Sequence, residues 1–129
     1  MATGFPASTG DVLSAAAFNG LVSYTINAQT GTTYTTVLND SYQVLITQSN
    51  ASANAIKIPT NASVAHPIGT VITVLNIGAG TCTISAVTSG TTTVLSAGTV
   101  PASPTLGQYK SAALVKVLSD TWYVVGSVG

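Results

Sequence analysis

Charged side chains are almost absent from this sequence of 129 residues. Asp, Glu, Lys and Arg together make up 5% of it, against about 25% in an ordinary soluble protein. The formal net charge is zero and there is no Glu, so no basic patch can neutralise nucleic-acid phosphates and no cluster of carboxylates can hold a hard metal ion. We therefore expect no nucleic-acid partner and no metal site.

Cysteine and histidine occur once each, as Cys82 and His66. A single cysteine excludes an internal disulfide, and one cysteine with one histidine cannot complete a structural zinc site. A reactive thiolate would need a cation or a helix N-terminus beside it. Cys82 alternates with Ile84 and Ala86, which predicts a small buried apolar side chain, although a Cys82–His66 dyad stays open as an alternative.

Export and membrane signals are also missing. Residues 1–20 contain no Lys or Arg, and their apolar stretch "DVLSAAAFNG" is interrupted by polar residues, which fits neither a signal peptide nor a membrane anchor. The sequence therefore predicts a protein made in the cytoplasm, not secreted and without a membrane partner. In that setting the Asn-x-Ser triplets at Asn39, Asn50 and Asn61 are expected to be turn residues and not glycosylation sites.

Short apolar runs alternating with Thr, Ser, Asn and Gly fill the chain from residue 21 onward. About nine such runs are separated by turn residues at spacings of about ten residues, and they are "LVSYTI", "TTYTTVL", "YQVLITQ", "NAIKIP", "TVITVLNI", "TCTISA", "TTTVLS", "SAALVKVL" and "WYVVGS". We find no fixed internal period, which argues against a solenoid. The pattern predicts an all-β domain over residues 21–129, an antiparallel β-sandwich of jelly-roll type.

Two of these runs, 71–77 and 114–118, are apolar on both strand faces. An antiparallel sandwich buries one face of each sheet, so the second face needs another cover, most economically a second copy of the chain. We predict that the interior contains Val44, Ile46, Ile56, Ile58, Val71, Leu75, Ile77, Ile84, Val115 and Val124. The candidate subunit interface is then formed by Ile72, Val74, Leu114 and Leu118.

The stretch "NIGAGTCTIS" could begin a phosphate-binding loop, but the third glycine of a dinucleotide motif is absent and a strand pattern follows. Gly78 and Gly80 are instead expected to supply positive φ in a hairpin loop. No Gly-x-Ser-x-Gly elbow is present, so we predict a protein that is not an enzyme and has no cofactor. Trp122 and Tyr123 are candidate glycan contacts, because aromatic rings can stack on sugars.

Residues 1–20 differ from the rest of the chain and form a candidate N-terminal arm. Gly4, Pro6 and Gly10 predict extended backbone, and Ser14 could cap a short helix over 15–18. The arm carries an apolar set suited to attachment by ordering on a partner, consisting of Phe5, Val12, Leu13 and Phe18. A frayed terminus is the alternative.

Two stretches resemble a β module found in many tailed-phage structural proteins. They are "NAIKIPTNASVAHPIGTVITVLNIGAG" (Asn54 to Gly80) and "QYKSAALVKVLSDTWYVVG" (Gln108 to Gly126). That module has an Ile-x-Ile-Pro run, an Asn-x-Ser-Val-Ala-x-Pro-x-Gly-Thr turn, and a closing Tyr-Ser-Ala-Ala followed by Asp-Thr-Trp. Lys110 interrupts the Tyr-Ser pair here, and His66 occupies a position that is often aromatic. The segment "TGDVLSAAAFN" is similar to the leading segment of phage tail-fibre and appendage proteins.

The resemblance implies a β-sandwich used as a trimeric building block on phage tails and capsids, with no catalytic residues. Together with the low charge, it leads to the hypothesis of a capsid decoration (cement) protein on the surface of the virion. Its expected partners are itself, as a homotrimer, and the major capsid protein, which the arm would grip. The alternative is a small tail-fibre or fibre-adaptor subunit that binds a receptor or carbohydrate.

Overall fold

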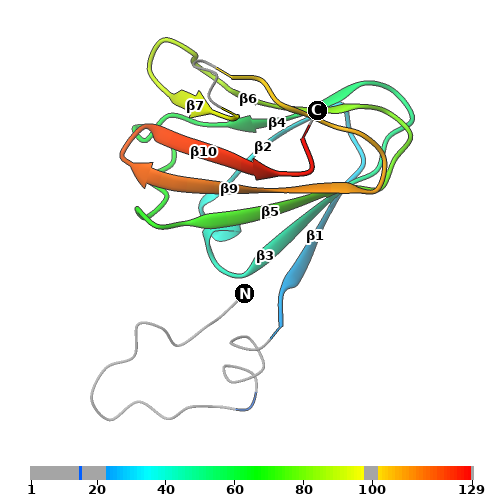
Figure 1. The fold of residues 1–129 in the computed structure, drawn as a ribbon. Coiled ribbons are helices and arrows are strands. Elements are labelled where there is room, and N and C mark those ends of the chain that lie inside the picture. The colour runs from blue at the N-terminus through cyan, green and yellow to red at the C-terminus, as the bar shows by residue number, and fades with distance from the viewer. Residues whose placement is uncertain (1–14, 16–22, 98–101, 129) are drawn as a thin grey trace.

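The structure, a computed structural model, describes residues 15, 23–97 and 102–128 (Figure 1). It is all-β, as predicted, and its strands form two sheets. The bounds are β1 Thr25–Gln29, β2 Thr33–Thr35, β3 Val44–Gln48, β4 Asn54–Ile58, β5 Val71–Asn76, β6 Cys82–Ala86, β7 Thr93–Leu95, β8 Thr105–Leu106, β9 Lys110–Leu118 and β10 Thr121–Gly126. A 3-10 helix, η1, spans Leu38–Ser41. Of the predicted arm and its helix, only Ala15 lies among the described residues.

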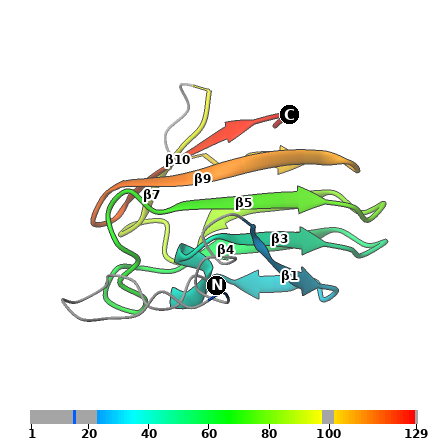
Figure 2. The same cartoon turned by 90° about the horizontal axis from the view of Figure 1, so that it is seen from below.

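The strands alternate between the two sheets along most of the chain. Sheet A has the order β1-β3-β5-β9-β10-β7, and sheet B has the order β2-β4-β6-β8. Each strand from β1 to β5 is followed by an arc that crosses to the other sheet, so the next strand of the same sheet is reached after a full turn and runs parallel. Residues 25–86 thus wind as a roll of three turns (Figures 1 and 2).

The predicted antiparallel arrangement is therefore wrong for most of the molecule. Five of the eight strand pairs are parallel, and only β5–β9, β9–β10 and β6–β8 are antiparallel. The jelly-roll connectivity is not confirmed. The turns of the roll also differ in length, since Thr25 pairs with Val44 after 19 residues whereas Leu45 pairs with Thr73 after 28. Because the turns of the roll differ in length, the sequence has no fixed repeat period.

Gly78 and Gly80 have a different role from the predicted one. They lie in the arc that joins β5 of sheet A to β6 of sheet B, which is no hairpin, and neither has positive φ. The arc stacks on residues 49–53 of the preceding turn, where the Gly80 N–H donates to the Asn50 carbonyl at 2.8 Å. A Cβ at Gly78 would overlap the Asn50 backbone, and one at Gly80 would overlap the Ser52 carbonyl. Close backbone stacking, and not backbone conformation, requires these glycines.

Between the sheets lies a core of short apolar side chains. As predicted, Val44, Ile46, Ile56, Ile58, Ile84 and Val124 are buried in it, and Cys82 joins them. The face assignment of β5 and β9 was reversed, however. Val71 and Ile77 are exposed and Leu75 and Val115 only half-buried, whereas Ile72, Val74 and Leu114 are fully buried.

Strand register explains the reversal. Residues aligned across neighbouring strands share a face, and Val74 of β5 is aligned with Ile46 of β3 and with Ala112 of β9, all of which point inward. A run that is apolar on both faces contains no signal that says which face turns inward.

Candidate functional site

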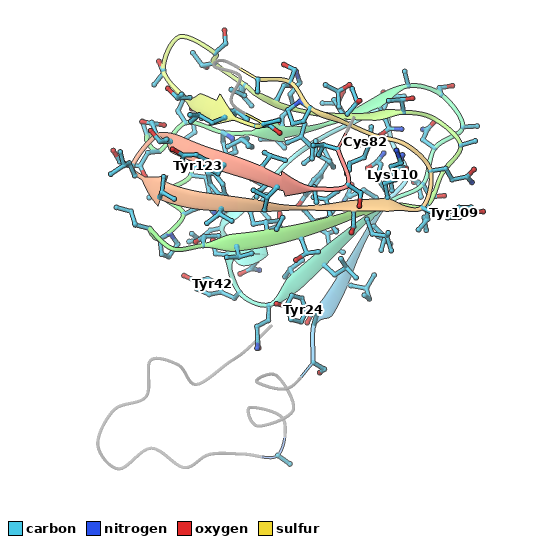
Figure 3. The ribbon with its side chains drawn as sticks, in the orientation of Figure 1. Tyr24, Tyr42, Cys82, Tyr109, Lys110 and Tyr123 are labelled. Carbon is cyan, nitrogen blue, oxygen red and sulfur yellow. The ribbon has the colours of Figure 1, made fainter. Side chains whose placement is uncertain are left out.

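The outer face of sheet A is a continuous apolar surface. One row of aligned residues crosses five strands and consists of Ile26, Leu45, Thr73, Ala113 and Val125. A second row crosses β5, β9, β10 and β7 and consists of Val71, Val115, Tyr123 and Leu95. Tyr123 is labelled on this sheet in Figure 3. Together with Leu75, these residues define what we call the outer face.

The outer face is open to solvent and carries no charge among its described residues. Ile26 is 56% exposed and Val125 is 54% exposed. Lys57 lies on sheet B, Asp40 and Lys116 are buried, and Asp120 lies in the turn between β9 and β10. Lys110 is exposed at the start of β9, but it is aligned with the buried Asn76 and so lies on the other face of the sheet. A largely apolar sheet face of this kind, with the small polar residues Thr73, Thr47 and Ser111 within or beside it, is typical of a protein–protein contact surface.

The predicted interface residues lie elsewhere. Ile72, Val74 and Leu114 are core residues of the same subunit, so their assignment to an interface between subunits was wrong. Leu118 is 62% exposed at the end of β9, beside the turn that leads into β10. The residues of the opposite strand face, such as Val71 and Val115, occupy the position that the interface prediction required.

The two candidate glycan contacts are separated by the sheet. Trp122 is 1% exposed, the His66 ring lies perpendicular to it at 5.4 Å between centroids, and the Lys116 ammonium lies 5.9 Å from the ring centre. A side chain this buried cannot stack on a sugar, so that assignment was wrong. Tyr123 points to the outer face and is exposed.

Beneath Trp122, at the end of the roll where η1 lies, is a cluster of buried polar side chains. The His66 ring makes hydrogen bonds with the Thr36 hydroxyl, 3.1 Å from Nε2, and with the Ser41 hydroxyl through Nδ1. Lys116 Nζ donates to Asn61 Oδ1 and to the His66 carbonyl, both at 2.7 Å. Burial, with the Lys116 charge as a second cause, lowers the pKa of His66.

Asp40 forms a second polar group nearby. Its carboxylate accepts hydrogen bonds from the Tyr34 hydroxyl at 2.6 Å, from the Asn27 amide at 3.0 Å and from the Val37 N–H at 2.9 Å. Burial and the bond to Asp40 raise the pKa of Tyr34 to about 12. These bonds fix η1 against β1 and β2.

The arrangement does not assemble a nucleophilic triad. The recorded partners of the Asp40 carboxylate are Tyr34, Asn27 and Val37, and His66 is buried under Trp122. The open alternative of a Cys82–His66 dyad also fails, because both His66 ring nitrogens face hydroxyl groups. Cys82 is buried as predicted, and burial raises its pKa to about 11, which keeps the thiol protonated.

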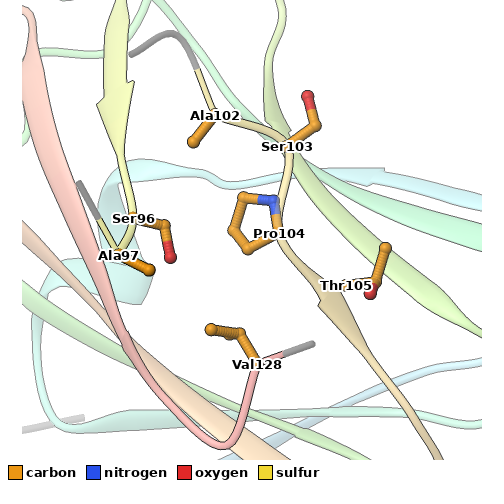
Figure 4. Close-up of a pocket in the computed structure, with 7 residues that line it drawn as sticks. All are labelled: Ser96, Ala97, Ala102, Ser103, Pro104, Thr105 and Val128. Atoms are coloured by element: carbon orange, nitrogen blue, oxygen red, sulfur yellow. The ribbon is translucent and has the colours of Figure 1, made fainter. Parts of the chain in front are cut away.

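A pocket of about 290 Å³ lies between β7, β8 and the segment after β10 (Figure 4). The side chains that line it are small, and none is ionisable. They are Ser96, Ala97, Ala102, Ser103, Pro104, Thr105 and Val128. The lining offers hydroxyl groups and apolar surface, but no acid, base or metal ligand.

Within residues 15, 23–97 and 102–128, no group of three His, Cys, Asp or Glu side chains is placed to hold a metal ion. No helix in these described ranges is long and apolar enough to cross a bilayer. The candidate attachment residues Phe5, Val12, Leu13 and Phe18 lie outside the described residues.

Sequence reasoning missed the contact between Asn61 and Lys116. Asn61 was expected to be a turn residue, and the run 114–118 was interpreted from its apolar residues alone. The available signal was that Lys116 shares a strand face with Leu114 and Ala112, which places a cation among apolar residues.

A scan against protein-family models and searches of curated proteins and of solved structures give no match.

Proposed function

We propose that this protein is a non-enzymatic structural component of a tailed-phage virion and assembles through the outer face of sheet A. The observation that carries the proposal is that six strands present one continuous, uncharged and apolar surface to solvent. Formal net charge of zero removes the long-range repulsion that would keep copies apart.

The energetics favour association through this face. Burying one large apolar side chain contributes about 1.5–3 kcal/mol, and association costs about 4–15 kcal/mol in lost freedom. The face includes Ile26, Val71, Tyr123 and Val125, all exposed in the single chain. Each is about half-exposed, so burying the rest of the four contributes about 3–6 kcal/mol per subunit and about twice that when both partners of a contact bury them, which is comparable to the lower part of the cost.

The polar side chains support a structural role over catalysis. His66, Asp40, Lys116 and Cys82 are all buried, and the first three are engaged with neighbours of the same chain. Such groups hold the end of the roll together and are closed to a substrate.

The place in the virion rests on the sequence resemblance. We propose a homotrimer that decorates the capsid surface, with the major capsid protein as its partner and residues 1–20 as the attachment arm.

The outer face is tested by Val125→Lys, with Val87→Lys as the matched control. The two valines are 54% and 53% exposed, but Val87 follows β6 of sheet B. We expect a trimer for the unmodified protein and for the control in sedimentation and native mass spectrometry, and a monomer for Val125→Lys. A monomeric unmodified protein, or a Val125→Lys trimer, would refute assembly through this face.

The location is tested by mixing the purified protein with phage heads that lack it and with isolated tails. Binding to heads is expected. Binding to tails alone, or glycan binding that is lost in Tyr123→Ser, would replace the decoration assignment with the fibre alternative.

A further inference from the structure

Lys116 is a buried amine without a carboxylate among its recorded acceptors. Its side chain is 1% exposed, and both oxygens that accept hydrogen bonds from Nζ belong to neutral amides, Asn61 and the His66 backbone. Burying an ammonium group against neutral partners is costly, and burial lowers the pKa of Lys116 accordingly. The charge of Asp120 opposes this shift, but the net direction is downward, so the neutral, nucleophilic amine is more accessible here than in an exposed lysine.

The amine lies against an electrophilic carbon. Nζ is 2.7 Å from Asn61 Oδ1, and Cγ is one C=O bond of about 1.23 Å from that oxygen, so Nζ and Cγ are at most about 3.9 Å apart. Reacting atoms in near-attack geometry are about 3–3.5 Å apart. The hydrogen bond therefore holds the amine within about 0.5 Å of the distance at which it could attack Cγ.

Asp120 lies beside the same asparagine. Its Oδ1 accepts the Asn61 backbone N–H at 2.8 Å and the Thr92 hydroxyl at 3.2 Å. The Trp122 ring, 5.9 Å from Nζ, covers the site on the side of β10. A buried amine, an amide carbon and a carboxylate are thus gathered at one partly buried place.

We propose that Lys116 and Asn61 form an intramolecular isopeptide bond. Neutral Nζ attacks Cγ of Asn61, which forms a C–N bond and places the electron pair of the C=O bond on Oδ1. The Asp120 carboxylate takes a proton from Nζ and delivers it to Nδ2, the C=O bond re-forms, and the Cγ–Nδ2 bond breaks. Ammonia leaves, and the product is a secondary amide. No oxidant, metal or cofactor is consumed.

The bond would connect the two sheets covalently. Lys116 belongs to β9 of sheet A, and Asn61 follows β4 of sheet B. It would also remove the buried amine, because an amide nitrogen carries no charge. The inference does not depend on the virion assignment, since it concerns one chain by itself.

Lys57 provides an internal control. It is half-buried, but its Nζ donates to the Ser85 hydroxyl at 2.9 Å, and a hydroxyl group has no carbonyl carbon to attack. Lys57 should stay a free amine under all conditions in which Lys116 reacts.

The test is mass spectrometry of the unmodified protein, denatured after incubation at neutral pH. We expect the intact mass to fall by one ammonia molecule. Trypsin should cleave after Lys57 and Lys110 but not after Lys116, and should release peptide 58–110 joined to peptide 111–129. Succinimide formation at an asparagine also loses ammonia, but it leaves cleavage after Lys116 intact and joins no peptides.

Full mass together with cleavage after Lys116 would overturn the proposal, as would ammonia loss without the joined peptide. Asp120→Asn keeps an oxygen acceptor for Asn61 and Thr92 but cannot carry the proton. With its circular dichroism unchanged, this variant should form the joined peptide at least about tenfold more slowly, and an undiminished rate would refute the role of Asp120. Lys57→Met should crosslink like the unmodified protein, and loss of the crosslink in this variant would contradict the assignment to Lys116.

Discussion

His66 couples the end of the roll to pH, because it is the only histidine and folding holds its pKa below the ordinary value of 6.5. Above that value the ring is neutral in both folded and unfolded chains, and the full stability is present. As pH falls below 6.5, the unfolded chain binds a proton that the folded chain excludes, so the free energy of unfolding decreases.

Urea denaturation between about pH 7.5 and pH 5 should therefore show stability falling by up to about 1.4 kcal/mol per pH unit at the acid end. His66→Gln, which retains hydrogen-bonding atoms for Thr36 and Ser41, should flatten this dependence. An equal slope in both proteins would show that another group is responsible.

Gly80 shows how a single methyl group is excluded by backbone stacking. In Gly80→Ala the new Cβ would overlap the Ser52 carbonyl, and we expect a loss of about 2–4 kcal/mol in the free energy of unfolding. Gly90→Ala is the control, because a Cβ there meets nothing within 4 Å. Equal melting temperatures for Gly80→Ala and Gly90→Ala would contradict the close backbone stacking at Gly80.

At the scale of elements, strand positions were predictable and strand pairing was not. The run "YQVLITQ" contains β3 and "NAIKIP" contains β4, because alternation of apolar and polar residues is a local property. Pairing depends on where the connections lead, and arcs such as 49–53 and 77–81 use the same Gly, Asn and Ser residues as hairpins do. The buried contacts of His66 and Lys116 join residues about 30–50 positions apart, which no local pattern encodes.

The position of each strand within its sheet should govern its amide exchange. β1 is an edge strand paired only with β3, and most of its residues are exposed, whereas β5 lies between β3 and β9 (Figure 2). We expect β1 amides to exchange at least about tenfold faster than β5 amides in hydrogen-exchange mass spectrometry. Equal protection of both strands would show that another chain or segment covers the β1 edge.

For the molecule as a whole, the described core is built from residues that lie outside the proposed attachment arm in the sequence. Deleting residues 1–20 removes none of the core residues, which run from Val44 to Val124. The truncated protein should keep a β-type circular dichroism spectrum and its trimeric state, but should no longer bind phage heads. Undiminished binding to heads would refute the role of the arm, and loss of the β spectrum would show that the arm belongs to the fold.

The central position of β9 constrains when the chain can fold during synthesis. Val71 of β5 pairs with Val115 of β9, and in sheet A β9 separates β5 from β10. When β1 to β6 have emerged from the ribosome, Leu114 of β9 is still inside it. Leu114 is the core residue that is aligned with Ile72 of β5. The β5 edge stays unpaired until β9 emerges, and an open apolar edge invites pairing with neighbouring nascent chains. We expect the core to close only once β9 has emerged, so that the spacing of ribosomes on the message influences the yield of correctly folded protein.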